Sequence, residues 1–275
     1  DLLVVQITTG GMEKVKDEVV TALQKVLSPK GILLRNDGSM RAMEGLESYT
    51  EVVHGEIPEL VRLEENGVPF EVSLTGGQKT GWFYDHRENR ARLGRYVNGC
   101  RVLDIFSYVG AWGIQAALMG AEELVCVDSS ATAIEQLRNN AELNGVGEKL
   151  TALQGDAFDA LKSLRDDREK FDVIVLDPPA FIKRKKDMKK GLEAYRRLNE
   201  LAMRLLTRDG ILVSASCSFH LSRKDLQNQL LKSSRHLDRN LTILEHGYQG
   251  PDHPIHPAIS ETEYLKAIFT RVLPV

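Results

Sequence analysis

The sequence predicts an α/β protein, with a mostly parallel, doubly wound sheet that follows a small α+β module. From about residue 101 onward, apolar runs of strand length alternate with helix-length segments. This alternation is typical of parallel sheets, because each parallel connection needs a crossover of helix length. The earlier part differs, with one amphipathic helix and several short strands. The glycine-rich segment 75–81 separates the two patterns, which predicts domains over residues 1–77 and 78–275.

The first module begins with an expected strand at 2–9, followed by an amphipathic helix at about 12–27. The apolar residues Val15, Val19 and Leu23 recur in this segment near helical spacing, and the Ser-Pro-Lys-Gly sequence at 28–31 ends the helix. An Asn-Gly pair at 66–67 signals a tight hairpin. Shorter strands are expected at 32–35, 61–64 and 69–74.

The second part predicts a sheet that ends in an antiparallel pair. Its first five strands are expected at 101–106, 123–128, 150–154, 171–177 and 210–216. A last pair at 242–245 and 264–272 is joined by the Pro- and His-rich loop 251–257. This loop leaves no room for a crossover helix, so the last two strands should pair antiparallel.

Composition indicates a globular protein with a real core. The chain has 275 residues, 42% of them hydrophobic, and a net charge of −3. We find no apolar run of the roughly 20 residues that a bilayer span requires and no signal peptide, so we expect a cytoplasmic protein without membrane association. Cys100, Cys126 and Cys217 are too few and too far apart for a disulfide framework or a zinc ribbon, which predicts reduced thiols and no metal.

A basic run follows the fourth strand of the second part. Such a run either holds a nucleic-acid backbone or forms a solvated helix start. Both interpretations are open from the sequence alone. Its six cations are Lys183, Arg184, Lys185, Lys186, Lys189 and Lys190.

A glycine turn after the first strand of the sheet suggests which cofactor binds there. A dinucleotide site favours Gly-x-Gly-x-x-Gly, whereas this chain offers only Gly110-x-x-Gly113. Asp104 at the strand end would repel a pyrophosphate but would pair with a cationic amino group. S-adenosylmethionine, a nucleoside with an α-amino group, therefore fits better than a dinucleotide.

Acids at the next two strand ends agree with this cofactor. Asp128 is placed for ribose hydroxyls, while Asp156 and Phe158 suit the amino edge and the ring of adenine. Each acid alone is as often a helix cap or a solvated turn. Three in succession after a glycine turn favour the methyl donor.

The sequence Asp-Pro-Pro-Ala-Phe at 177–181 ends the apolar run 173–176. Its prolines fix φ and lack N–H donors, so the turn should hold its shape against a flat substrate. Methyltransferases that act on exocyclic amino groups often carry an aromatic residue directly after Asp-Pro-Pro. Here Ala180 intervenes and Phe181 is displaced.

Cys217 lies among small polar residues after the fifth strand, whereas Cys126 and Cys100 are expected to pack in or beside the core. A thiolate that adds to carbon 6 of a pyrimidine makes carbon 5 nucleophilic. If the fourth and fifth strands are neighbours, Asp177 shares the crevice with Cys217 and hydrogen-bonds or protonates the ring N3. The general base is left open between His220, His256 and a water held by Asp177.

Several motifs occur in order along nearly the whole chain: Gln78-Lys79-Thr80-Gly81 with Asp85 and Arg87, Phe106-Ser107-Tyr108-x-Gly110, Asp177-Pro178-Pro179-x-Phe181, Ser216-Cys217-Ser218 and Asp252-His253-Pro254. With these motifs the chain resembles the RlmI-like ribosomal RNA large-subunit methyltransferases, which form 5-methylcytosine. The resemblance implies a Rossmann-like class I methyltransferase domain behind a central α+β domain. It also implies an RNA-binding PUA domain ahead of both, so we expect the natural protein to begin before Asp1.

The resemblance further implies roles for individual residues and an RNA partner, ribosomal RNA. His86 and Phe219 depart from the family pattern, which commonly has Gln and a smaller residue there. Uracil carbon 5, a guanine nitrogen, or RNA binding without catalysis are the alternatives, and a homodimer is one arrangement that the sequence leaves open. The expected donor-binding residues are Lys79, Thr80, Asp85 and Arg87 beside the methyl donor, Asp104, Phe106, Tyr108 and Gly110 at its methionine end, Asp128 at the ribose, Asp156 and Ala157 at the adenine, and Asp177, with Cys217 as the nucleophile.

Overall fold

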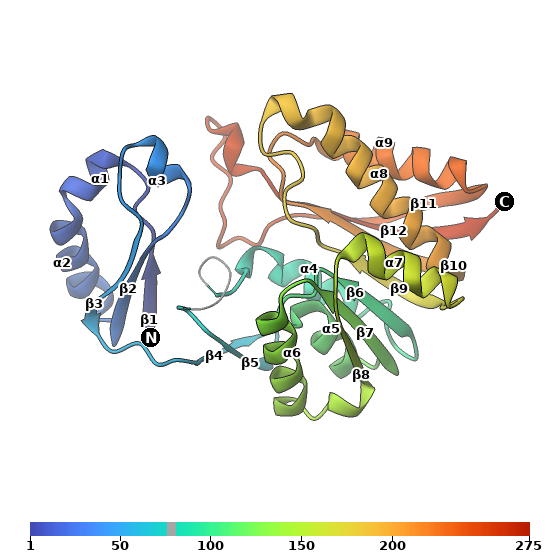
Figure 1. Ribbon diagram of the computed structural model, residues 1–275, viewed down its shortest axis with the longest axis horizontal. Helices are drawn as coiled ribbons and strands as arrows, with labels where there is room; N and C mark the ends of the chain where they lie inside the picture. Colours follow the sequence, from blue (N-terminus) through green and yellow to red (C-terminus); the bar gives the residue numbers. More distant parts are fainter. Residues whose placement is uncertain (76–80) are drawn as a thin grey trace. The chain divides into compact units, whose positions relative to one another are not determined.

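A computed structural model of the protein describes residues 1–75 and 81–275 (Figure 1). The chain forms two compact units, each built from two segments. The first unit is Asp1–Leu63 with Phe70–Phe83, and the second is Glu64–Pro69 with Tyr84–Val275. The expected boundary after residue 77 lies outside the described residues and stays a prediction.

The first unit contains a three-stranded sheet of β1 (Leu2–Val5), β2 (Gly31–Asn36) and β3 (Tyr49–Gly55). Strand β1 pairs parallel with β2, and β3 pairs antiparallel on the other side of β2. The helices of this unit are α1 (Gly10–Lys14), α2 (Lys16–Leu27) and α3 (Met40–Met43).

Two predicted elements of this unit are shorter or divided. The strand expected at 2–9 ends at Val5, and beyond it the Ile7 N–H donates to the Asn36 side-chain oxygen at 2.6 Å rather than to a backbone carbonyl of β2. The helix expected at 12–27 is interrupted at Val15, where φ is −112° and ψ is 25°. Strand β3 and helix α3 were not predicted.

The Asn-Gly hairpin is confirmed. Strands β4 (Val61–Glu65) and β5 (Val68–Val72) form a two-stranded sheet. Asn66 and Gly67 between them have φ of 55° and 78°. These left-handed conformations are the ones that a two-residue hairpin turn requires at both central positions.

The second unit contains a seven-stranded sheet in the order β11-β12-β10-β9-β6-β7-β8. Neighbours among β6 to β10 pair parallel, whereas β12 pairs antiparallel with both β10 and β11. The mostly parallel sheet with an antiparallel final strand is therefore confirmed. Its strands are β6 (Arg101–Ile105), β7 (Glu123–Asp128), β8 (Leu150–Gln154), β9 (Phe171–Leu176), β10 (Leu206–Ser216), β11 (Arg239–Gly247) and β12 (Lys266–Pro274).

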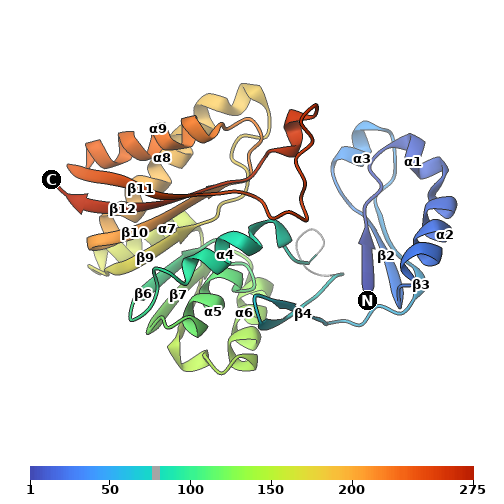
Figure 2. The ribbon, with the colours of Figure 1, turned by 180° about the vertical axis from the view of Figure 1, so that it is seen from behind.

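Helices cover both faces of this sheet, as Figures 1 and 2 show. Helix α8 packs against both α7 and α9, and α4 packs against α5. From β6 the chain moves outward through β7 to β8, and then returns past β6 to β9 and β10. Right-handed crossovers in opposite directions place their helices on opposite faces. The helices are α4 (Arg87–Leu93), α5 (Ala111–Leu118), α6 (Ala131–Leu143), α7 (Ala157–Asp166), α8 (Met188–Leu205) and α9 (Arg223–His236).

The direction of winding reverses between β6 and β9, which are neighbours in the sheet. In open α/β sheets this switch point is where ligands bind, outside the carboxyl ends of the strands. The Asp177 N–H donates to the Ile105 carbonyl at 3.4 Å, so the ends of the two strands remain together. The fold thus sets Asp104 and Asp177 at the place where a ligand is expected.

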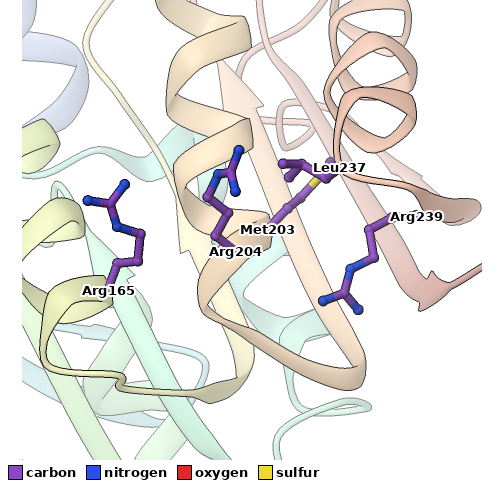
Figure 3. Close-up of a pocket in the computed structure, with 5 residues that line it drawn as sticks. All are labelled: Arg165, Met203, Arg204, Leu237 and Arg239. Carbon is purple, nitrogen blue, oxygen red and sulfur yellow. The ribbon is translucent and has the colours of Figure 1, made fainter.

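A basic pocket lies at the opposite end of the strands from the switch point, where the helices end (Figure 3). It is lined by Arg165 at the end of α7, Met203 and Arg204 at the end of α8, Leu237 directly after α9, and Arg239 at the start of β11. This pocket is distinct from the switch point. No helix among residues 1–75 and 81–275 is both long enough and apolar enough to cross a lipid bilayer.

Candidate active site

Asp104 is a fully buried acid at the switch point. Its Oδ2 accepts the Gly113 N–H at 3.0 Å, whereas its Oδ1 has no hydrogen-bond partner among the described residues. Burial raises the pKa of Asp104 to about 7; the Gly113 N–H lowers it in part, and the charges of Asp177 and Asp128 raise it further. A buried oxygen without a donor is unusual. The unpaired Asp104 Oδ1 fits a binding site in which a cationic group of the ligand donates the missing hydrogen bond.

The loop after β6 folds back tightly beside this acid. Phe106, Tyr108 and Gly110 have φ of 68°, 49° and 91°. Left-handed conformations are uncommon for residues other than glycine and cluster at ligand sites. The N–H groups of Phe106 and Ser107 both donate to the Val127 carbonyl, at 2.9 and 3.0 Å. The loop is therefore held against the end of β7.

Gly113 allows α5 to approach the strands closely. A Cβ at this position would lie 2.7 Å from the Cys126 sulfur and 3.4 Å from Asp104 Oδ2. We expect Gly113→Ala to lower the free energy of unfolding by about 1–3 kcal/mol, because a tightly packed core resists an added methyl group. Gly155→Ala is the matched control, since nothing lies within 4 Å of its Cβ. Urea unfolding of both variants measures the difference, and equal stability of the two would contradict this packing.

Asp128 and Asp156 both bind backbone N–H groups. Asp128 Oδ2 accepts the Tyr108 N–H, and its Oδ1 accepts the Ser130 N–H, both at 2.9 Å. Asp156 is exposed and caps α7, its Oδ1 accepting the Phe158 N–H at 2.9 Å. Helix α7 begins at the buried Ala157. The cap interpretation of Asp156 thus holds, and its second oxygen is not used by the cap.

Two ring nitrogens contact the carboxylate of Asp177. Its Oδ2 accepts the indole N–H of Trp112 at 3.0 Å, and His86 Nε2 lies 3.2 Å from its Oδ1. The His86 and Trp112 rings are 5.3 Å apart. Burial raises the pKa of Asp177, but His86, Trp112 and the more distant Arg90 outweigh it, so the pKa lies below its ordinary value. Asp177 is thus held as a carboxylate.

A buried network of polar side chains lies beside the ring of Trp112. Arg90 forms a bidentate ion pair with Glu65, and both side chains are almost completely buried. Gln115 donates to the same carboxylate at 2.9 Å, and Asn66 donates to Gln115 at 2.8 Å. The Arg90 guanidinium lies 5.9 Å from the Trp112 ring. The hairpin turn is therefore fixed to α4 and α5.

Cys217 follows the last residue of β10, between two buried serines. Its thiol is partly exposed and is not in a disulfide. The Tyr195 hydroxyl is hydrogen-bonded to Ser216 Oγ at 2.8 Å and to Ser218 Oγ at 3.0 Å. Ser218 Oγ also accepts the Ile182 N–H at 3.3 Å. Because Ile182 follows the Asp-Pro-Pro-Ala-Phe turn, this bond joins the turn to residues 216–218, which we call the cysteine loop.

The Asp-His-Arg segment at 85–87 lies against the loop that precedes β12. Asp85 Oδ2 accepts the Tyr264 hydroxyl at 2.9 Å, and burial together with Asp85 raises the pKa of Tyr264. Arg87 forms an ion pair with Asp252 at 3.2 Å. Two motifs far apart in the sequence therefore meet. The expected donor-binding residues Lys79 and Thr80 lie outside the described residues.

The structure thus brings the strand-end acids together and sets Cys217 at the neighbouring strand. Strands β9 and β10 are parallel neighbours, as the shared crevice requires. Of the suggested bases, His220 lies in the loop after Cys217, and the exposed His256 uses its Nδ1 to accept the Ala258 N–H. The partners of Asp177 were missed by the sequence analysis, although the position of Trp112 inside the glycine turn was a usable signal.

A family of sequences described as S-adenosylmethionine-dependent methyltransferases matches residues 39–267. The ribosomal RNA large subunit methyltransferase I of Aeromonas salmonicida is 40% identical over 273 residues, which are 98% of this chain and 69% of that protein. The protein of the same name from Tolumonas auensis is 37% identical, over 99% of this chain and 70% of its own length. The chain belongs to this methyltransferase family. Its methyl donor is S-adenosylmethionine, as predicted.

Solved structures show the fold of this methyltransferase. A protein of Streptococcus mutans described as a candidate S-adenosylmethionine-dependent methyltransferase has a TM-score of 0.84 at 22% identity, covering 98% of this chain and 68% of that chain. A candidate methyltransferase in complex with S-adenosylhomocysteine has a TM-score of 0.85 at 23% identity, with the same coverage. The Rossmann-like methyltransferase fold is confirmed.

Proposed function

We propose that this methyltransferase forms 5-methylcytosine in large-subunit ribosomal RNA, with Cys217 as the nucleophile. The names of the curated relatives support the RNA substrate. The observation that carries the chemistry is the position of Cys217, a partly exposed thiol at the carboxyl end of β10, beside the turn that holds Asp177. A guanine nitrogen is already nucleophilic and needs no such thiol.

The residues around the switch point fit the methyl donor. Asp104 offers its buried Oδ1 to the cationic amino group, and the left-handed turn 106–110 brings backbone close to the methionine end. Asp128 would hold the ribose and Asp156 the amino edge of adenine, with Ala157 beneath the ring. When bound, S-adenosylmethionine supplies an electrophilic methyl group. The further residues proposed to line the donor are Lys79, Thr80, Asp85, Arg87, Phe106, Tyr108, Gly110 and Asp177.

The thiolate of Cys217 adds to carbon 6 of the ring. The electron pair of the 5,6 double bond shifts to form a 4,5 double bond and the pair of the 3,4 double bond moves to N3, so carbon 5 becomes an enamine-like nucleophile. Carbon 5 gains its methyl group as the bond from that group to sulfur breaks, which leaves S-adenosylhomocysteine, and the electron pair on N3 re-forms the 3,4 double bond. A base then removes the carbon 5 proton. The released electron pair restores the double bond and expels the thiolate. Cys217 is thus regenerated in each turnover.

Asp177 is proposed to hold the pyrimidine ring. Its lowered pKa favours a carboxylate, which accepts hydrogen bonds, over an acid that donates a proton to N3. The exocyclic amino group of cytosine can donate a hydrogen bond to this carboxylate. With Oδ1 facing His86 and Oδ2 bonded to Trp112, the carboxylate is held in one orientation.

The basic run at 183–190 is proposed to hold the RNA backbone. All six of its cations are exposed, and Arg184 forms an ion pair with Asp187 at 3.4 Å. The run follows the Asp-Pro-Pro-Ala-Phe turn and leads into α8. Lysine and arginine at such a place bind phosphates without reading sequence.

Two measurements test this function. Nucleoside mass spectrometry after reaction of ribosomal RNA with labelled donor should find 5-methylcytidine; 5-methyluridine or a methylguanosine would move the substrate to another base. RNA that carries 5-fluorocytidine should form a covalent adduct with the protein in the presence of donor, because fluorine blocks loss of the carbon 5 substituent. RNA with 5-fluorouridine is the matched control. Methylation of cytosine without any adduct would exclude the thiol mechanism.

A further inference from the structure

Lys266 is a buried lysine beside the cysteine loop. It is the first residue of β12, and only 5% of its surface is exposed. In the antiparallel pair of β10 and β12 it lies opposite Ser216, the residue before Cys217. A buried ammonium group is expensive in free energy unless polar or charged groups compensate for it. Its position therefore needs an explanation.

The ammonium group of Lys266 is directed at the loop itself. Its Nζ donates to the Ser218 carbonyl at 2.6 Å, a short charge-assisted hydrogen bond. Ser218 is the residue after Cys217, so Lys266 pairs with one neighbour of the cysteine through the strand register and with the other through its side chain. The two residues that flank the thiol are fixed by the same lysine.

Lys266 and Cys217 also interact electrostatically. Burial lowers the pKa of Lys266 to about 8; the negative charge of Cys217 raises it, Arg223 lowers it and Glu263 raises it. Lys266 is therefore mainly cationic at neutral pH. A cation near a thiol favours the thiolate, which is the nucleophilic form.

We infer that Lys266 is a positioning residue for Cys217, which fixes the cysteine loop against β12 and stabilises the thiolate. This inference rests on the proposed role of Cys217 as the nucleophile. Tyr195 and the two flanking serines hold the same loop, but they are neutral and do not supply the charge. Lys266 adds that charge from a buried position at the start of β12.

Other ionisable groups share this environment. Arg223, at the start of α9, lies with its guanidinium 4.0 Å from the Tyr248 ring and adds a second positive charge. Glu263 opposes it from the segment before β12. The groups that face the Cys217–Lys266 pair are Tyr195 from α8, Arg223 from α9, and Glu263 and Tyr264 from the segment before β12.

The pH dependence of Cys217 alkylation tests the inference without RNA. The protein is treated with iodoacetamide, and modification of the Cys217 peptide is followed by mass spectrometry. In the wild type, the midpoint of the profile should lie below the value of about 8.5 for an ordinary thiol. In Lys266→Met, the rate at pH 7 should fall about ten-fold, because the thiol loses a neighbouring cation. Lys266→Arg, which keeps the charge, should retain more of the reactivity.

Lys232→Met is the control, since it removes an exposed lysine of α9 and should leave the profile unchanged. Circular dichroism establishes that each variant is folded. An unchanged profile in folded Lys266→Met, or a wild-type midpoint at or above that of an ordinary thiol, overturns the inference. If Lys266→Met does not fold, the wild-type midpoint and Lys266→Arg decide. If the alkylation profile of Lys266→Met shifts but the protein forms no adduct on 5-fluorocytidine RNA, the proposed function is contradicted. The electrostatic coupling of Lys266 and Cys217 is then still supported.

Discussion

Replacing Cys217 with alanine is expected to reduce kcat for RNA methylation by about 10³-fold or more, because carbon 5 of the pyrimidine then lacks covalent activation. Binding of the methyl donor should be unchanged, since none of the residues proposed to line the donor lies in the loop that follows β10. The free energy of unfolding should change by less than about 1 kcal/mol, as expected for a partly exposed side chain. Single-turnover methylation and calorimetry with S-adenosylhomocysteine separate these effects.

Cys100→Ala is the matched control for this change. The Cys100 thiol is also partly exposed, and it donates to the Tyr96 carbonyl at 3.3 Å, at the amino end of β6 and away from the carboxyl ends of the strands. Its activity should equal that of the wild type. Cys217→Ala with activity within three-fold of the wild type would sink the nucleophile assignment.

Replacing Asp104 with asparagine is expected to weaken binding of the methyl donor by about 100-fold or more. The change keeps the shape of the side chain and an oxygen for the Gly113 N–H, but it removes the charge that would pair with the amino group of the donor. Loss of one partner from a buried charge pair costs about 2–5 kcal/mol. Calorimetry with S-adenosylmethionine measures the loss, and unchanged affinity would contradict the assignment.

The same substitution should stabilise the free protein at alkaline pH. The pKa of Asp104 is about 7 in the folded protein, against about 3.9 in an unfolded chain. The folded state therefore binds more protons between these values. By linkage, stability from this group is fully present below about pH 4 and is lost as the pH rises to about 7, a loss on the order of 4 kcal/mol.

Urea unfolding at pH 5 and pH 8 checks this sign. Asparagine does not ionise, so the advantage of Asp104→Asn over the wild type should be larger at pH 8 than at pH 5. Glu122→Gln, at an exposed acid directly before β7, controls for the loss of one negative charge. An advantage of equal size at both pH values would show that Asp104 ionises normally.

The alternation of strand and helix was readable because parallel strands buried on both faces form nearly continuous apolar runs. The strands at 123–128 and 150–154 have the predicted bounds. Strand β3 was missed because none of its residues is buried, so its sequence lacks the alternation of apolar and polar residues that marks a half-buried strand. Strand β10 begins at Leu206 rather than at residue 210, since the register with β9 shifts between Leu206 and Ile211, an irregularity that no sequence period reveals.

The candidate site also contains residues that could be predicted from the sequence and contacts that could not. Acids at strand ends were found because topology places all carboxyl ends at one edge of the sheet. The approach of His86 and Trp112 to Asp177 depends on how α4 and α5 pack, and the pairing of Lys266 with Ser216 depends on strand register. Such contacts are set by tertiary structure, which local patterns do not encode.

The ion pair of Arg90 and Glu65 joins two residues of the second unit, between which the chain passes through the first unit. Glu65 belongs to the short segment Glu64–Pro69, after which the chain returns to the first unit before it re-enters the second at Tyr84. A fragment that starts at residue 78 would retain the arginine and lose its carboxylate, leaving an uncompensated charge in the interior. The catalytic unit is therefore not one continuous stretch of sequence, and grafting or exchanging it between proteins requires carrying the hairpin turn along.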